Sequence, residues 1–288
     1  MKIGLILSNA RRAAQADIAR RAEQLGYDSL WAGEHIILPV ENADTHPYGR
    51  PNLVTPFGDT LEAFTQLAYL AGVTERIRLA TGVILLPIRN LFSTARQIAT
   101  LDIFSGGRLD LGVGVGWHGG EFELMGADFK ARGAHADEFL DALNRLFTER
   151  TPSFQGRHIS FPSVGFEPKP LQSPRPPILV GGDSLPAMRR AALRGDGWYG
   201  HASTPEQGRE RIETVDRLLV EQGRDPAGFQ HVLQVWDPPE PDALRAYAAA
   251  GADRLVIAPF TPKDPDPVRT LETYAARIGL TASQEIAL

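Results

Sequence analysis

The fold of this chain is decided by the stretch Arg76–Gly126, which reads RIRLATGVILLPIRNLFSTARQIATLDIFSGGRLDLGVGVGWHGGEFELMG. An apolar segment ends in Thr81-Gly82-Val83, a helical segment follows from about Leu91 to Phe104, and a second apolar segment ends in alternating glycines. This order is typical of a strand, a crossover helix and a parallel strand. Because both strands end in residues with small side chains or none, we expect a flat or extended group to approach the backbone closely there.

The same alternation continues on both sides of this stretch, with short apolar runs followed by longer amphipathic ones. The expected strands are Ile3–Leu7, Asp28–Ala32, Ile77–Leu86, Leu109–Val113, Pro177–Val180, Gly197–Tyr199, Gln230–Val235 and Arg254–Ala258. The expected helices are Ala13–Leu25, Thr60–Ala71, Leu91–Phe104, Ala134–Thr148, Ser184–Leu193, Pro205–Gln222, Pro241–Ala250 and Asp266–Ile278. About eight such units predict a (β/α)8 TIM barrel that forms a single domain over residues 1–288.

An open, doubly wound sheet is the alternative fold. It more often carries a Gly-x-Gly-x-x-Gly turn after its first strand, and Ser8-Asn9-Ala10-Arg11 is not such a turn. Two long segments, Gly33–Asp59 and Thr151–Pro176, are expected to be insertions in the barrel. Phe154, Phe161 and Phe166 suggest that the second insertion either lines a substrate pocket with apolar side chains or covers the side of the barrel.

The composition excludes several classes of function. The 288 residues include no cysteine, which rules out disulfides, thiol catalysis and cysteine-ligated metals. A net charge of −5 argues against broad binding to nucleic acids or anionic membranes, and no apolar run approaches the length of a membrane span. The Met1–Leu7 segment is too short for a signal peptide, so we expect a cytoplasmic protein.

In a parallel barrel, the residues that directly follow each strand form the rim of the active site. The candidates on this rim are Asn9, Glu34, His35, Thr81, Gly82, Val83, Gly114, Val115, Gly116, Trp117, His118, Gly181, Gly182, Asp183, Ser184 and His201. The rim has no lysine for a Schiff base, and the sequence has neither a His-x-His pair nor a His-Glu-x-x-His helix for a metal. A glycine-rich rim with few titratable groups favours a bound cofactor that supplies the reactivity, and we expect no metal.

The segment Gly181-Gly182-Asp183-Ser184 is the best candidate for a phosphate site. An apolar strand runs into two glycines, and Ser184 is placed to cap the next helix. Backbone N–H groups and the helix dipole would then point toward an anion, although an ordinary tight turn explains the same residues and the charge of Asp183 is an objection.

His35 is the leading candidate for a catalytic residue. It directly follows the second strand, and histidine can transfer a proton near neutral pH. A neighbouring carboxylate can tune such a group, and Glu34 is next to it in the sequence. The alternative is a histidine whose hydrogen bonds are satisfied within its loop. Asn9, Glu34, Trp117, His118 and His201 are weaker candidates that we assign to the substrate pocket.

Three blocks of sequence together resemble the luciferase-like monooxygenase superfamily, and more closely its coenzyme F420-dependent oxidoreductases. They are Gly26–His35, Arg76–Gly126 and Pro177–Trp198, and the resemblance covers roughly residues 1–200. It implies a barrel with a flavin or deazaflavin at its carboxyl face and a non-prolyl cis peptide bond at Gly82–Val83 behind the cofactor ring. It also implies that His35 lies near the reactive carbon, with the phosphates on the Gly181–Ser184 turn and the ring and substrate lined by Gly114–Trp117.

The resemblance is incomplete in the loop that follows the fourth expected strand. A sugar-phosphate dehydrogenase of this family has a glutamate early in this loop that serves as an acid. This chain has Trp117 at that position, and Glu121 comes later. We therefore do not transfer the sugar-phosphate substrate of that enzyme to this chain. The expected function is hydride transfer between F420 and a small organic substrate. The alternatives are a reduced-FMN monooxygenase that uses O2 and a non-catalytic flavin-binding barrel. The resemblance also implies a homodimer.

Overall fold

The structure of the chain is a computed structural model, and it describes residues 1–7, 12–40, 60–261 and 263–281. Eight parallel strands form a closed barrel, because β3 pairs with both β2 and β5 at the point where the circle closes. In order around the barrel these strands are β1 (Lys2–Ile6), β2 (Ser29–Ala32), β3 (Arg78–Thr81), β5 (Leu109–Gly114), β8 (Ile178–Gly181), β9 (Gly197–His201), β10 (Gln230–Gln234) and β11 (Arg254–Ile257). The predicted TIM barrel is confirmed.

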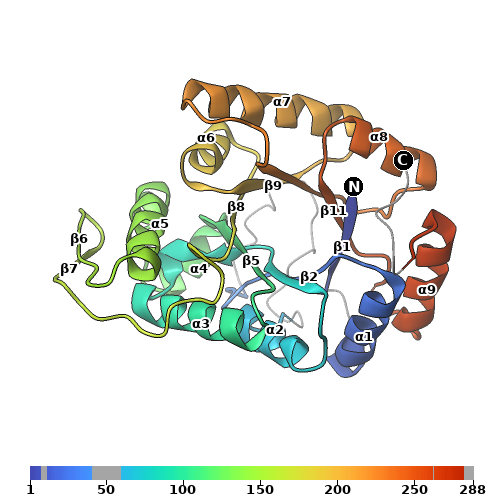
Figure 1. The fold of residues 1–288 in the computed structure, drawn as a ribbon, viewed down its shortest axis with the longest axis horizontal. Coiled ribbons are helices and arrows are strands. Elements are labelled where there is room, and N and C mark those ends of the chain that lie inside the picture. Colours follow the sequence, from blue (N-terminus) through green and yellow to red (C-terminus); the bar gives the residue numbers. More distant parts are fainter. Residues whose placement is uncertain (8–11, 41–59, 262, 282–288) are drawn as a thin grey trace.

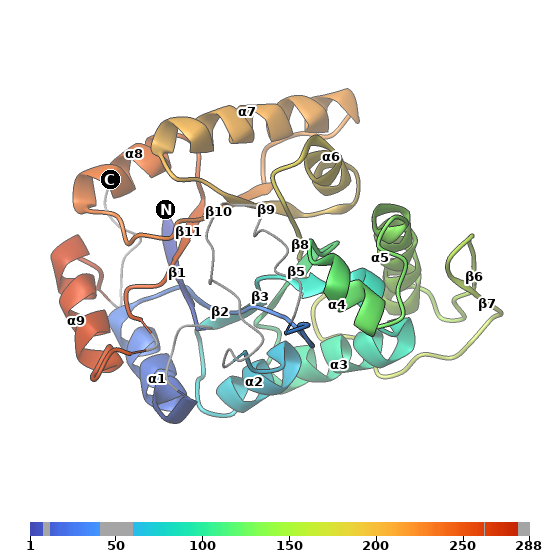
Figure 2. The same ribbon diagram turned by 180° about the vertical axis from the view of Figure 1, so that it is seen from behind.

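Helices surround the barrel on the outside, as Figures 1 and 2 show from opposite ends. They are α1 (Gln15–Leu25), α2 (Ala63–Ala71), α3 (Leu91–Phe104), α5 (Arg132–Thr148), α6 (Leu185–Arg194), α7 (Pro205–Glu221), α8 (Pro241–Ala249) and α9 (Pro267–Ile278). Short 3-10 turns lie at Arg12–Ala14 and Leu86–Ile88. No helix within the described ranges is both long and apolar enough to span a membrane.

The expected third strand, Ile77–Leu86, is interrupted. β3 ends at Thr81, the Gly82–Val83 peptide bond is cis as the resemblance implies, and β4 (Ile84–Leu85) then pairs with β5. A further short helix, α4 (Gly119–Leu124), follows β5 and was not predicted. His118 is its N-cap and Glu121 is at the third helical position, a spacing that resembles a capping box and could have indicated this helix.

The second insertion covers the flank of the barrel. Its hairpin, β6 (Phe154–Gln155) and β7 (Ser160–Phe161), lies beside α5 at the outer edge of the molecule in Figure 1. Phe161 contacts Phe92 of α3 with ring centroids 5.3 Å apart, and Phe166 contacts Phe147 of α5 at 5.9 Å. Of the two alternatives for this segment, the structure supports the side of the barrel rather than the pocket.

The interior of the barrel is apolar at mid-height. Trp31 and Tyr199 stack with their ring centroids 4.8 Å apart, and Ala80, Leu179, Val232 and Val256 pack around them. Trp198 points the opposite way from Tyr199, as adjacent residues of a strand do, and is buried between the sheet and the helices. Gly4 leaves room for Trp31, since a Cβ at this position would lie 2.5 Å from the indole nitrogen.

A cluster of buried charges closes the amino end of the barrel. The Asp110 carboxylate accepts hydrogen bonds from Arg78 on β3 and Arg254 on β11, the latter at 2.8 Å. Arg254 also forms an ion pair with Asp28 at 2.7 Å. Asp110 and Arg254 are almost completely buried, so each charge depends on its partners for stabilisation.

We expect the substitution Asp110→Asn to lower the free energy of unfolding by about 3–5 kcal/mol, because it leaves the buried guanidinium group of Arg254 and the partly buried one of Arg78 without their shared carboxylate. Urea unfolding followed by circular dichroism measures this loss. Asp17→Asn is the matched control, since Asp17 is exposed and its ion pair with Arg20 is 3.5 Å long. A loss for Asp110→Asn as small as that of the control would contradict the assignment.

Candidate active site

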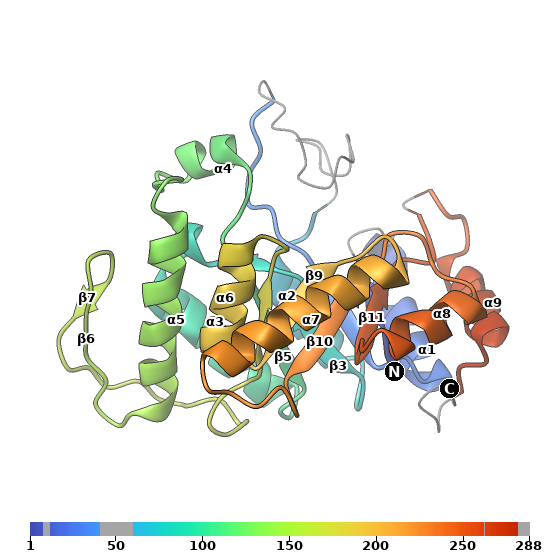
Figure 3. The same cartoon turned by 90° about the horizontal axis from the view of Figure 1, so that it is seen from above.

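The described candidates gather at the carboxyl ends of β2, β3, β5, β8 and β9, as the barrel requires. Figure 3 shows α4 projecting beyond these strand ends, on the same side as the segment that follows β2. Asn9 lies outside the described residues. Within the described ranges, no three His, Cys, Asp or Glu side chains are arranged to hold a metal ion.

The glycines at the strand ends make room for the residues that follow β3. A Cβ at Gly112 would lie 1.8 Å from the carbonyl oxygen of Thr81. A Cβ at Gly114 or Gly181 would lie 2.5 or 2.8 Å from a methyl group of Val83. The absence of side chains at these three positions therefore serves the protein's own packing, and direct contact of Gly114, Val115 or Gly116 with a cofactor stays a prediction.

The side chain of Val83 consequently lies against the carboxyl ends of β5 and β8. It is only partly buried and packs against both the barrel interior and the cluster of Leu85, Ile88 and Phe122. Thr81 is fully buried, and its hydroxyl donates a hydrogen bond of 2.7 Å to the carbonyl oxygen of Gly112. Contact of Thr81, Gly82 or Val83 with a cofactor stays a prediction.

The Gly181–Ser184 turn is held in place by β9 and α7. The Gly182 N–H donates to the carbonyl oxygen of Tyr199, and the Gly182 carbonyl accepts from the indole of Trp198 at 2.8 Å. Ser184 caps α6 by accepting from the N–H of Ala187, as predicted. This turn thus presents the N-terminus of α6 at the carboxyl end of the barrel.

The charge of Asp183 is compensated within the protein. One carboxylate oxygen accepts from the N–H of His201 at 3.0 Å, and the other accepts from Arg211 of α7 at 2.9 Å. The objection that Asp183 would repel a nearby anion is therefore weakened. The sequence did not indicate that Arg211 pairs with Asp183, because the two residues are 28 positions apart.

His35 contacts Glu121 and not its sequence neighbour Glu34. The His35 Nδ1 is 2.9 Å from a carboxylate oxygen of Glu121, and the other oxygen of Glu121 accepts from the N–H of Ile36 at 2.7 Å. The Glu121 side chain is fully buried, whereas that of His35 is 14% exposed. Trp117 lies edge-on to the His35 ring, with centroids 5.9 Å apart.

The contacts of Glu34 are with Arg89 and Leu85 and not with the neighbouring His35, and its assignment to the substrate pocket stays a prediction. Its buried carboxylate pairs with Arg89 and accepts from the N–H of Leu85 at 2.9 Å. Burial alone would lower the pKa of Arg89, but hydrogen bonds and ion pairs with Glu34 and Glu62 raise it above its ordinary value. The pair ties the loop after β2 to the turn after β4.

Two other histidines of the rim are buried. His118 accepts a hydrogen bond from the N–H of Glu121 at its Nδ1 and so caps α4. His201 ends β9, and its ring lies 5.7 Å from that of Trp236. His35 is thus the partly exposed histidine of the rim.

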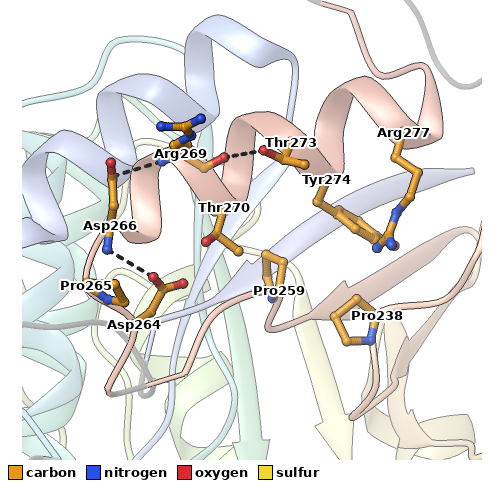
Figure 4. Close-up of a pocket in the computed structure, with 10 residues that line it drawn as sticks. All are labelled: Pro238, Pro259, Asp264, Pro265, Asp266, Arg269, Thr270, Thr273, Tyr274 and Arg277. Carbon is orange, nitrogen blue, oxygen red and sulfur yellow. Dashed lines mark hydrogen bonds between the residues drawn. The ribbon is translucent and has the colours of Figure 1, made fainter.

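A separate groove of about 440 Å3 runs along α9 (Figure 4). It is lined by Pro238, Pro259, Asp264, Pro265, Asp266, Arg269, Thr270, Thr273, Tyr274 and Arg277. In Figures 1 and 2, α9 lies on the opposite side of the barrel from α4. This groove contains none of the rim residues named above and is not the candidate active site.

Comparison with known proteins agrees with this geometry. The profile of the family described as "Luciferase-like monooxygenase" matches residues 3–276. The chain belongs to the luciferase-like monooxygenase family. An uncharacterised protein of Mycobacterium tuberculosis is 32% identical over 272 residues, which cover 91% of this chain and 93% of that protein.

Three further similarities concern one curated enzyme and two solved structures. An FMNH2-dependent dimethylsulfone monooxygenase of Pseudomonas putida is 35% identical over 141 residues, 48% of this chain and 38% of that enzyme. The fold matches an F420-dependent secondary alcohol dehydrogenase with a TM-score of 0.78 at 18% identity, over 99% of both chains. It also matches the monooxygenase RslO1 of Streptomyces bottropensis with a TM-score of 0.77 at 22% identity, over 96% of this chain and 98% of that one.

We expect Gly112→Ala to destabilise the protein by about 1–3 kcal/mol or more, because its Cβ would displace the backbone of Thr81. Gly165→Ala is the control, since a Cβ there meets no atom within 4 Å. Urea unfolding of both variants provides the comparison. Equal stabilities would show that the end of β3 can move away from β5 without cost.

Proposed function

We propose that this chain is an F420-dependent oxidoreductase that transfers a hydride between the deazaflavin cofactor and a small organic substrate. The observation that carries the proposal is the placement of His35, a partly exposed histidine at the carboxyl end of the barrel, close to Trp117 and held by Glu121. Removing a hydride from an alcohol also requires a group that accepts the hydroxyl proton, and histidine suits this role near neutral pH.

The residues present fit such a cofactor. Val83 offers an apolar wall for one face of a ring, and the N-terminus of α6 offers the helix dipole to a phosphate. The Asp183–Arg211 ion pair leaves this turn without an uncompensated negative charge. When bound, F420 accepts or donates a hydride at carbon 5. For the oxidation of an alcohol, we assign His35 to take the hydroxyl proton as the substrate becomes a carbonyl compound, and to return a proton in the reverse direction.

The second candidate is a reduced-FMN monooxygenase that uses O2. Its support is the partial similarity to the dimethylsulfone monooxygenase, which is higher in identity than the likeness to the F420-dependent dehydrogenase but covers half of the chain. Both candidates use the same barrel end and the same anion turn, so cofactor affinity distinguishes them.

The decisive experiment is a pair of binding titrations of the apoprotein, one with F420 and one with FMN. We expect micromolar or tighter binding of F420 and weaker binding of FMN. The reverse order would favour the monooxygenase, and binding of neither would contradict the assignment of the Gly181–Ser184 turn.

His35→Ala tests the proton-transfer role. With F420 and a panel of small secondary alcohols as probes, we expect kcat/KM to fall by about 10²–10⁴-fold while F420 affinity is unchanged. Full activity in the variant would remove His35 from the mechanism. Tight cofactor binding without turnover of any probe by the wild type would instead favour a non-catalytic binding protein.

A further inference from the structure

We infer that Glu121 is the positioning residue of His35: it holds the imidazole through Nδ1, so that Nε2 is the nitrogen that exchanges a proton with the substrate. The proton exchange rests on the proposed function, whereas the contact between the two side chains does not.

The carboxylate of Glu121 clamps the segment after β2 at two points. One oxygen lies 2.9 Å from His35 Nδ1 and the other accepts the N–H of Ile36 at 2.7 Å. Two successive residues are thereby fixed to one buried side chain from another loop. A rotation of the His35 ring would break its hydrogen bond with Glu121. The two contacts of Glu121 therefore fix the orientation of the imidazole as well as the path of the backbone.

Glu121 is itself held firmly. Its N–H donates to His118 Nδ1 at 3.2 Å, and its carbonyl oxygen accepts from the N–H of Met125 at 3.0 Å. The next residue, Phe122, is fully buried against Leu85 and Ile88. The carboxylate therefore stands on a short helix that is anchored at its first turn and by an apolar side chain.

The contact selects one tautomer of His35. An ionised carboxylate has acceptors only, so the hydrogen bond requires the proton to be on Nδ1. The neutral ring then carries its lone pair on Nε2, at the opposite edge from Glu121, where it can accept the proton of a substrate hydroxyl. After that transfer both nitrogens carry protons, and Nε2 can donate in the reverse reaction. The arrangement resembles the orientation of a catalytic histidine by a buried carboxylate in hydrolases.

Glu34 cannot take this role although it precedes His35 in the chain. Its carboxylate is committed to Arg89 and to the N–H of Leu85. Two buried carboxylates near one histidine thus have separate tasks: Glu34 holds the loop, and Glu121 holds the ring.

The test is imidazole 15N NMR of the apoprotein, which reports directly which ring nitrogen carries the proton. The seven histidines allow assignment of the His35 signals by their absence in His35→Gln. Spectra of the wild type are compared with those of Glu121→Gln, whose amide can offer either an oxygen or an NH2 group to Nδ1. Glu123→Gln is the matched control, because Glu123 lies on the same helix and is exposed.

We expect neutral His35 to be protonated on Nδ1 in the wild type and in Glu123→Gln, and to shift toward the Nε2-protonated form in Glu121→Gln. Protonation on Nε2 in the wild type, or an unchanged ring in Glu121→Gln, would overturn the inference. If Glu121→Gln fails to fold, the wild-type spectrum alone still decides between the tautomers.

Kinetics with F420 and the same secondary alcohols add a second readout. We expect kcat of Glu121→Gln to fall by about tenfold or more with little change in KM, and Glu123→Gln to match the wild type within twofold. If Glu121→Gln lost the Nδ1-protonated tautomer of His35 but kept the wild-type kcat, the link between this tautomer and catalysis would be contradicted. Correct tautomers in a protein that turns over no probe would instead count against the proposed function and leave the positioning by Glu121 intact.

Discussion

The site depends on the close approach of the chain after β3 to β5 and β8. Thr81 places its carbonyl oxygen where a side chain of residue 112 would be, and Val83 covers the backbone of Gly114 and Gly181. Three neighbouring strands are thereby brought together under one valine side chain. The position of the Val83 side chain at the carboxyl ends of the strands follows from this packing, and the turn after β8 and the segment after β2 lie around it.

The sequence indicated the barrel and its strand ends, because these depend on periodicity and on local motifs, whereas the cis peptide bond at Gly82–Val83 was implied by the resemblance to the family. It did not indicate which side chains meet. Glu121 is 86 residues from His35 and Arg89 is 55 residues from Glu34, and no local pattern specifies such contacts. The prediction that Glu34 tunes His35 rested on adjacency in the chain. Neighbouring residues at a strand end point in different directions, and Glu34 accordingly turns to Arg89.

The glycines at the end of β5 also differ from what the sequence suggested. Their spacing at the end of β5 suggested a platform for a flat ligand, yet their immediate neighbours are Thr81, Val83 and Phe122. A glycine-rich strand end reports that something lies close to the backbone, but it does not distinguish the protein from a ligand. The short helix α4 could have been found from the spacing of His118 and Glu121, which is a local signal.

The flank and the carboxyl end of this barrel are built from separate parts of the chain. The insertion after α5 is fastened to the outside of the barrel by aromatic contacts with α3 and α5, whereas the loops after β2 and β5 hold the histidine and its carboxylate. We therefore expect changes in the hairpin to leave the contact between His35 and Glu121 undisturbed. The length and surface chemistry of this flank can therefore vary independently of the contact between His35 and Glu121.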